Sequence, residues 1–327
     1  MELRPVRDLP DLTTWHAVVE ATFAADHAGL PADPLDEFRP LLEAHPLDDG
    51  EQKILLLGCA GADVVGAVRL GLPMKDNLTS CSVDVRVHPE RRRQGHGRSL
   101  LALALQQVEA LGRTRVFGEV PSPLAGGPGA AEPMLREVGA RPVLREVRRL
   151  LDLQAVPPGD APAAPAGYRL VQWVHRVPDE HLEDMAYLMH RMSTDVPLGD
   201  MDWEPEVWDA QRYRDKEAAA GAAGRVRYAT LAVSETTGKA AGFTDIGVSR
   251  YRPDVAYQWE TIVDREHRGH GLGYVLKAHN HRLLVDSSPD TRLINTWNAE
   301  TNVHMIAVND RLGFDPVELW TEWQLDR

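Results

Sequence analysis

The chain contains the stretch Val263-Asp-Arg-Glu-His-Arg-Gly-His-Gly-Leu-Gly273 and a second one like it, Val87-His-Pro-Glu-Arg-Arg-Arg-Gln-Gly-His-Gly97. The two align without gaps at an offset of 176 residues. Each follows a run typical of a β-strand and precedes a run with apolar residues three and four positions apart, which predicts a helix. A strand–loop–helix unit that occurs twice predicts two domains of similar design.

The segment from Pro157 to Gly167 separates the two copies. It holds four prolines in eleven residues and no bulky side chain, which is typical of a linker. We therefore expect an N-terminal domain over residues 1–155, a linker over 156–167 and a C-terminal domain over 168–327. In the second domain the patterns predict helices over 179–192, 206–223 and about 302–311, and a hairpin of strands 227–233 and 240–249.

Composition restricts the classes of function. The chain has 327 residues, of which 43% are hydrophobic and 26% charged, as in ordinary globular proteins. Its net charge of −13 argues against nucleic acid or an anionic membrane as the main partner. No apolar run is long enough for a membrane helix, and the first residues do not resemble a signal peptide, so we expect a cytoplasmic protein. Cys59 and Cys81 are expected to be reduced and buried, and no metal site is indicated.

The glycine-rich loops are suited to binding a phosphate group. A strand that enters a glycine turn at a helix start gathers backbone N–H groups around one point, and the helix dipole adds positive potential there. The nicotinamide fingerprint is excluded because its third glycine would fall at Tyr274 in one copy and Leu100 in the other. Neither copy has the Gly-Lys-Ser/Thr of a Walker loop. Another phosphate-bearing cofactor remains.

Both loops resemble the Gln/Arg-x-x-Gly-x-Gly/Ala motif of the GNAT superfamily of N-acetyltransferases, which use acetyl-CoA. The segment from Asn298 to Phe314 resembles a second motif of that family, a helix that flanks the cofactor. This resemblance spans nearly the whole chain. It implies an α/β fold of two tandem GNAT-like domains, each with a mixed, mainly antiparallel sheet flanked by helices.

The resemblance also implies a cofactor site in each half, with acetyl-CoA as cosubstrate and no metal. The loop residues expected to hold its diphosphate are Arg268, Gly269, His270, Gly271, Leu272 and Gly273 in the second half, and Arg92, Arg93, Gln94, Gly95, His96 and Gly97 in the first. The strand residues expected along its pantetheine arm are Thr261, Ile262, Val263, Val85 and Val87. Asn302 is expected to face the same arm.

The catalytic groups are less well defined by the sequence. Where the family often has a tyrosine that protonates the leaving thiolate, this chain has Asn309, and Leu135 in the first copy. Glu260 is a possible general base, unless strand alternation turns it to the other face of the sheet. Asp84 holds the equivalent place in the first half. Because that half lacks the asparagines of the second motif and has an irregular stretch over 121–129, we expect the C-terminal domain to be catalytic.

The connection between the first two helices of the second domain, residues 195–206, holds five carboxylates and a tryptophan. It favours a cationic acceptor if it borders the acceptor cleft, and is otherwise a solvated loop with helix caps. We therefore expect an acetyl-CoA-dependent N-acetyltransferase that acts on a primary amine of a small molecule by direct attack. The alternatives are a non-catalytic acyl-CoA-binding tandem module and a peptide N-terminal acetyltransferase. The chain is expected to be a monomer or a homodimer.

Overall fold

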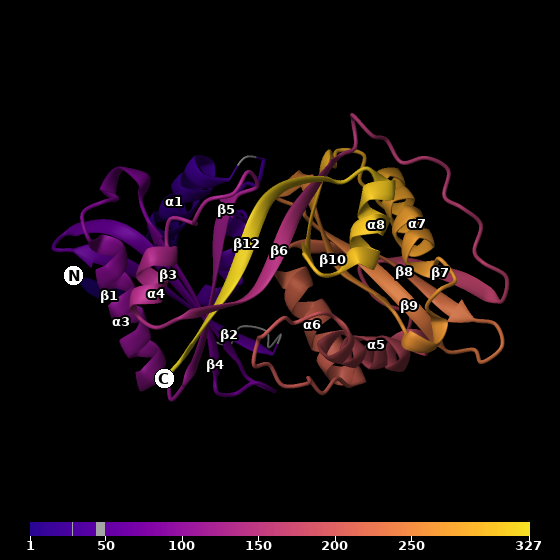
Figure 1. Cartoon of the computed structure of the whole chain (residues 1–327), viewed down its shortest axis with the longest axis horizontal. Helices are drawn as coiled ribbons and strands as arrows, with labels where there is room; N and C mark the ends of the chain where they lie inside the picture. Colours follow the sequence, from indigo (N-terminus) through magenta and orange to yellow (C-terminus); the bar gives the residue numbers. More distant parts are fainter. Residues whose placement is uncertain (28, 44–49) are drawn as a thin grey trace.

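The computed structural model describes residues 1–27, 29–43 and 50–327. These residues form one twelve-stranded sheet with helices on both faces (Figure 1). The strands of the first half are β1 (Glu2–Pro5), β2 (Glu51–Ala60), β3 (Asp63–Pro73), β4 (Ser80–Val87), β5 (Arg115–Pro123) and β6 (Arg141–Asp152). Those of the second half are β7 (Tyr168–Val174), β8 (Arg225–Ser234), β9 (Ala240–Ser249), β10 (Arg252–Val263), β11 (Leu293–Ala299) and β12 (Asp315–Asp326).

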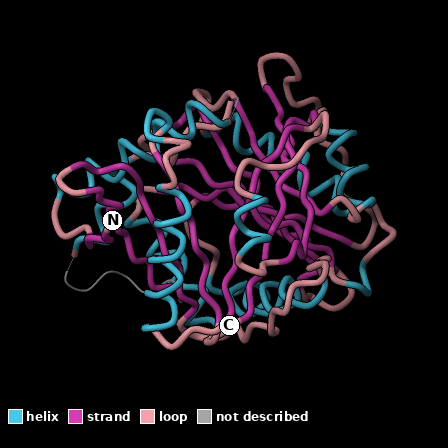
Figure 2. The backbone as a smooth tube through the Cα atoms, turned by 60° about the vertical axis from the view of Figure 1, so that its left-hand side comes forward, coloured by secondary structure: helices cyan, strands magenta, loops and turns pink. Residues whose placement is uncertain are grey.

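Helices flank this sheet along both halves, as the tube in Figure 2 also shows. The first half has α1 (Leu9–Asp26), α2 (Leu35–Phe38), α3 (His96–Ala110) and α4 (Glu132–Glu137). The second half has α5 (Leu182–Asp195), α6 (Ala210–Ala222), α7 (Leu272–Ser287) and α8 (Val303–Leu312). Single turns of 3-10 helix cover Arg39–Leu42, Pro89–Arg91, Asp179–His181 and Arg265–His267. The described residues contain no helix long and apolar enough to cross a membrane.

Helix ends differ from the predicted ones where side chains cap them. The helix predicted to begin at residue 206 begins at Ala210, because the Asp209 carboxylate accepts a hydrogen bond of 2.7 Å from the Arg212 N–H and so caps it. The predicted helix over 179–192 is a single turn followed by α5. α8 ends at Gly313, whose φ of +88° is the left-handed conformation that glycine adopts at helix ends.

The strand order is β1-β2-β3-β4-β5-β12-β6-β11-β10-β9-β8-β7. Only the pairs β4–β5 and β10–β11 are parallel, so the expected mixed and mainly antiparallel arrangement is confirmed. At the centre β12 lies between β5 and β6, and β6 pairs with β11. The final strand of each half therefore adds to the sheet of the other half, and the two lie side by side in Figure 1. The sheet is continuous across the predicted domain boundary at residue 155.

Apolar side chains on the helices fix them against the sheet. Leu100, Ala104 and Val108 of α3 are buried against strands of the first half. Leu276 of α7 is buried against Ala232 and Ala241 of the second half. Both helices start directly after a glycine loop, so this packing also fixes the position of each loop. Cys59 and Cys81 are buried and unpaired.

Candidate functional site

The first glycine loop connects β4 to α3. Gly95 has a φ of +83°, and a Cβ placed on it would meet no atom within 4 Å, so the loop leaves open space beside this residue. Within the described chain, the backbone N–H groups from Gln94 to Arg98 donate to no protein acceptor. Such unpaired amides at a helix start are donors for an anion.

The second glycine loop, between β10 and α7, has the same geometry. Gly269 and Gly271 have φ values of +84° and +74°, and neither would bring a Cβ within 4 Å of another atom. The N–H groups from Gly269 to Tyr274 likewise donate to no acceptor among the described residues. Each loop thus offers the amides and the space that a diphosphate needs.

The arginine at the start of each glycine loop binds both the preceding strand and a neighbouring helix. Arg92 Nε donates to the Val87 carbonyl at 3.1 Å, and its guanidinium forms two 2.7 Å hydrogen bonds with Asp26 at the end of α1. In the second half Arg268 donates to the Val263 carbonyl at 3.1 Å and to Asp195, at the end of α5, at 2.9 Å. The two arginines thus have equivalent partners in the two halves, a strand carbonyl and an aspartate at the end of a helix. Their predicted contact with the diphosphate stays a prediction.

The parallel strands diverge beside each loop. β4 and β5 are registered only from Ser80 with Arg115 to Ser82 with Phe117. Beyond that point the edge of β4 that carries Val85 and Val87 has no partner on the β5 side. β10 and β11 diverge in the same way after Tyr257 and Asn295, which leaves Thr261, Ile262 and Val263 with one free backbone edge. An extended chain can add as a strand to such an edge.

In the second half, Glu260 lies within a network of charges. Lys216 of α6 is 2.6 Å from its carboxylate and Arg227 of β8 is 3.8 Å away, while Asp245 accepts the Glu260 N–H at 3.0 Å. Burial alone would raise the pKa of Glu260, but the ammonium of Lys216 and the guanidinium of Arg227 outweigh it and lower that pKa far below its usual range. A carboxylate held in this way is a weak proton acceptor, so the geometry argues against the predicted base.

Asn309 is fully buried between two polar side chains. Its Oδ1 accepts a 2.5 Å hydrogen bond from Lys277 Nζ of α7, and its Nδ2 donates to Asn298 of β11. Burial lowers the pKa of Lys277 to about 7. Asn302, expected along the cofactor, caps α8 by accepting a 3.2 Å hydrogen bond from the Met305 N–H. The sequence did not indicate that Lys277 takes part in this network.

A cavity of about 320 Å³ lies where the two halves meet. Its floor takes one side chain from each of five neighbouring strands: Glu119 of β5, Trp320 of β12, Glu146 of β6, Trp297 of β11 and Tyr257 of β10. Its other walls are Phe23, at the end of α1, and Leu30, Pro31 and Asp33, from the connection to α2. Glu119 lies two residues beyond the last β5 residue paired with β4, so the cavity adjoins the point where β4 and β5 diverge.

The carboxylates of this region have raised pKa values. Burial, and then the charge of Glu119, raises the pKa of Glu146 to about 7. Burial and the charges of Glu119 and Glu146 raise the pKa of Glu322 to about 9. The side chain of Glu119 reaches solvent, but desolvation by the atoms around it raises its pKa, Arg69 opposes that shift and Asp84 adds to it. No motif marked these three glutamates in the sequence, because each stands singly on a strand.

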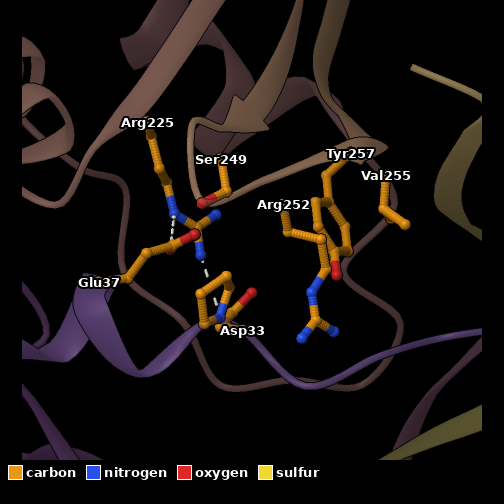
Figure 3. A pocket seen from close by; sticks show the side chains of 8 residues that line it. Asp33, Glu37, Arg225, Ser249, Arg252, Val255 and Tyr257 are labelled. Atoms are coloured by element: carbon orange, nitrogen blue, oxygen red, sulfur yellow. Dashed lines mark hydrogen bonds and ion pairs between the residues drawn. The ribbon is translucent and has the colours of Figure 1, made fainter. Parts of the chain in front are cut away.

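An ion-pair cluster fixes one wall of the cavity. Arg225 of β8 reaches from the second half to Glu37 of α2, at 2.5 Å, and to Asp33, at 3.1 Å (Figure 3). A small pocket lies beside these ion pairs, and Tyr257 and Asp33 line both this pocket and the larger cavity. The ion pairs of Arg225 therefore join the α1–α2 connection of the first half to the strands of the second half.

The acidic connection over residues 195–206 does not present five free carboxylates to a cleft. Asp195 is only 1% exposed and binds Arg191, Arg265 and Arg268. The other side chains are occupied as follows: Asp202 pairs with Arg115 and Glu206 with Arg212, while Trp203 packs on Phe117. The backbone of Asp200 binds that of Val143 and the backbone of Glu204 binds Asn77. The connection serves to join the halves. Among the described residues no group of three or more His, Cys, Asp or Glu is arranged to hold a metal.

Comparisons with known proteins agree with this geometry. The model of the acetyltransferase (GNAT) family matches residues 15–123, in the first half. A tandem GNAT protein from the clavulanic acid biosynthesis pathway is 32% identical, with 99% of this chain and 98% of that one covered and a TM-score of 0.80. A GCN5-related N-acetyltransferase from Sphaerobacter thermophilus has the same fold at 16% identity, with 99% and 95% covered and a TM-score of 0.69. No curated protein matches the sequence. With its two loops, its two diverging strand pairs and a full-length relative of this kind, the chain belongs to the GNAT family of acetyltransferases as a tandem member.

Proposed function

We propose that the protein is an acetyl-CoA-dependent N-acetyltransferase that acetylates a primary amine of a small molecule by direct attack, and that the transfer takes place in the first half. The observation that carries this proposal is the position of Glu119, beside the diverging strands β4 and β5 and in an open cavity. The family model, which matches residues 15–123, also supports the first half. The sequence alone had favoured the second.

The residues of the first half fit the cosubstrate. The amides from Gln94 to Arg98 would hold the diphosphate, and the free edge of β4 at Val85 and Val87 would pair with the pantetheine arm. When bound, acetyl-CoA supplies the acetyl group as a thioester. A backbone N–H of this edge would stabilise the negative charge that develops on the thioester oxygen.

Glu119 is placed to accept the proton that the ammonium must lose before it attacks, directly or through one water. A carbon–nitrogen bond then forms as the carbon–sulfur bond of the thioester breaks. The nitrogen gives up its extra proton to water and the departing thiolate takes a proton from water, so that the step ends with the amide and the free thiol. The raised pKa of Glu119 suits this task because a base with a pKa nearer to the working pH transfers protons more effectively. In the second half the corresponding residue, two positions after the last paired residue of β11, is Trp297.

The second half keeps a complete glycine loop, but its possible base is neutralised by Lys216 and Arg227. We infer that this half binds a second acetyl-CoA without transferring its acetyl group. The alternative function, a non-catalytic acyl-CoA-binding module, would then describe the second half alone. The cavity of about 320 Å³ favours a small acceptor over a peptide.

Two glycine substitutions test which half works. Gly95→Glu and Gly271→Glu each place a carboxylate among the unpaired backbone amides of one glycine loop. Binding of acetyl-CoA at that loop should fall by about 100-fold or more, because the carboxylate repels the diphosphate and because glutamate does not favour the positive φ of the glycine. Calorimetry should then show one binding equivalent in either variant. Thiol release with a panel of amines should stop in Gly95→Glu and persist in Gly271→Glu.

The matched control is Gly112→Glu, at the far end of α3. Gly112 also has a positive φ, +73°, with no atom within 4 Å of an added Cβ, so the control carries the same backbone strain and charge away from the loop. It should bind two equivalents and turn over normally. Loss of turnover in Gly271→Glu alone would instead assign the reaction to the second half.

A further inference from the structure

The aromatic side chains of the cavity are held in place before any ligand binds. The rings of Trp297 and Trp320 meet edge to face with centroids 5.8 Å apart, and Tyr257 is stacked near Trp297 at 6.3 Å. Trp320 also stacks on His27 and donates its indole N–H to Glu318 at 2.9 Å. Faces of tryptophan and tyrosine rings attract cations, and fixed rings lose little entropy when a ligand binds.

Two carboxylates, Glu119 and Glu146, line the same cavity from strands of the first half, and a third, Glu322 of β12, lies beside them. Glu119 lies directly opposite Glu322 in the register of β5 and β12, and Glu146 lies opposite Trp320 in that of β6 and β12. Residues opposite each other in register share a face of the sheet, so the three carboxylates gather on the cavity side. Among the described residues, no lysine or arginine forms an ion pair with Glu119, Glu146 or Glu322.

The surrounding charges do not balance these carboxylates. The charged groups that act on Glu119 from β3 and β4 are Arg69, Asp84 and Arg86. Arg86 is already bound to Asp84 at 2.9 Å, and Arg69 lies 4.0 Å from the same carboxylate. With every group ionised, Asp84 and the three glutamates set four negative charges against two guanidinium groups. An excess of two negative charges remains.

Two other acidic groups near the cavity have ion-pair partners. Asp33 pairs with Arg225, and Glu318 pairs with Arg148 at 3.0 Å and with His27 at 3.1 Å. The carboxylates without an ion-pair partner are therefore Glu119 and Glu146, which line one end of the cavity, and Glu322, which lies opposite Glu119 on β12. The rings of Trp297 on β11 and Tyr257 on β10 lie at the other end of the same strand series, whereas Trp320 on β12 lies between the strands of Glu119 and Glu146.

We propose that this cavity is the acceptor site and that it selects a dication, a small molecule with two amino groups. One ammonium lies beside Glu119 and Glu146, where it loses a proton and is acetylated, while the other lies against Trp297 and Tyr257. This inference rests on the proposed function, since it places the acceptor beside the diverging strands β4 and β5, where acetyl-CoA is proposed to bind. Both halves are needed to build the site, because the strands that carry these rings belong to the second half.

The charge balance also accounts for release of the product. Acetylation converts one ammonium into a neutral amide, so the product carries a single positive charge. Carboxylates that ionise when a dication binds then bind the singly charged product more weakly than the acceptor. The raised pKa values of Glu146 and Glu322 fit the same picture, because a dication would displace protons that these carboxylates otherwise hold.

Calorimetry on the full chain without acetyl-CoA tests the proposal, with 1,4-diaminobutane as the probe and 1-aminobutane as the matched monoamine. We expect the diamine to bind about tenfold more tightly or better. Glu146→Gln and Trp297→Leu should each weaken diamine binding by about tenfold, whereas Trp297→Phe, which keeps an aromatic face, should stay within about threefold. Glu235→Gln, an exposed carboxylate on the β8–β9 turn, should change nothing.

Equal affinity for the two amines, or full diamine affinity in both Glu146→Gln and Trp297→Leu, would overturn the proposal. Acetyl-CoA binding, measured on the same variants, should be unchanged and so reports that they are folded. Measurement of thiol release distinguishes failure of the proposed function from failure of the dication site. Diamine binding that depends on the cavity but gives no thiol release would refute the proposed function alone. Turnover of monoamines unaffected by the cavity variants would refute the dication site alone.

Discussion

Replacing Lys277 by methionine should change how stability depends on pH. Lys277 is 1% exposed, and its ammonium contacts the Asn309 amide and lies 5.0 Å from the centre of the Phe314 ring. No carboxylate lies within ion-pair distance of it among the described residues. Methionine has a similar length and no charge, so it removes the titrating group while filling most of its volume.

The magnitude follows from the pKa of Lys277, which is about 7 in the folded chain against 10.5 when exposed. Between these values the unfolded chain binds the proton and the folded chain does not, so the wild type gains stability as pH rises from about 7 to 10.5. Each pKa unit corresponds to about 1.4 kcal/mol, which makes the full effect roughly 5 kcal/mol as an upper bound. Asn309 loses a donor in the variant, at a cost of about 1 kcal/mol or more that does not depend on pH.

Urea unfolding of wild type and Lys277→Met between pH 6 and 9.5 measures the effect. The stability difference should change in favour of the wild type by about 1 kcal/mol per pH unit above pH 7.5. The cavity glutamates also titrate in this range, but they are present in both proteins and cancel in the difference. Lys239→Met, at an exposed turn, is the control and should show no such slope. A flat difference for Lys277→Met would show that Lys277 keeps an ordinary pKa and refute this reading of its burial.

Four further substitutions test other parts of the structure. Glu119→Gln should lower turnover by about 100-fold near neutral pH, with partial recovery at high pH where the amine loses its proton unaided, and with acetyl-CoA binding unchanged. Glu260→Gln should leave turnover within about threefold but lower the stability by about 2 kcal/mol, because Lys216 loses its partner and Arg227 keeps only Asp245. A large rate loss that recovers at high pH would restore Glu260 as the base. Gly247→Ala should destabilise the fold by about 2 kcal/mol, since the new methyl group would lie 2.3 Å from the Trp259 ring. Gly221→Ala, in open space on α6, should instead stabilise the fold by about 0.5 kcal/mol; thermal unfolding measures both effects.

The sequence predicted those features that depend on local structure. A glycine loop between a strand and a helix needs only neighbouring residues, and the positive φ values of Gly95 and Gly271 are a local requirement. The internal repeat, the helices and the hairpin of the second half follow from the same short-range patterns. The mixed sheet followed from the family resemblance that these loops carry.

The features that the sequence did not predict all depend on distant residues. The carboxylate of Glu260 is neutralised by Lys216, 44 positions away, so its pattern on β10 could not reveal a weak base. Glu119, Glu146 and Glu322 meet only because β12 lies between β5 and β6, and strand patterns do not specify which strands pair. The acidic connection was visible as a cluster of charges, but its arginine partners were not.

The exchange of central strands makes the order of synthesis matter. As the chain leaves the ribosome, β5 emerges with one edge unpaired, and its neighbour β12 is made almost 200 residues later. Until then the nascent first half exposes main-chain groups that could pair with another chain. Translation of residues 315–326 therefore closes both halves at once, and a ribosome that stalls before this point would leave an incomplete product prone to aggregate.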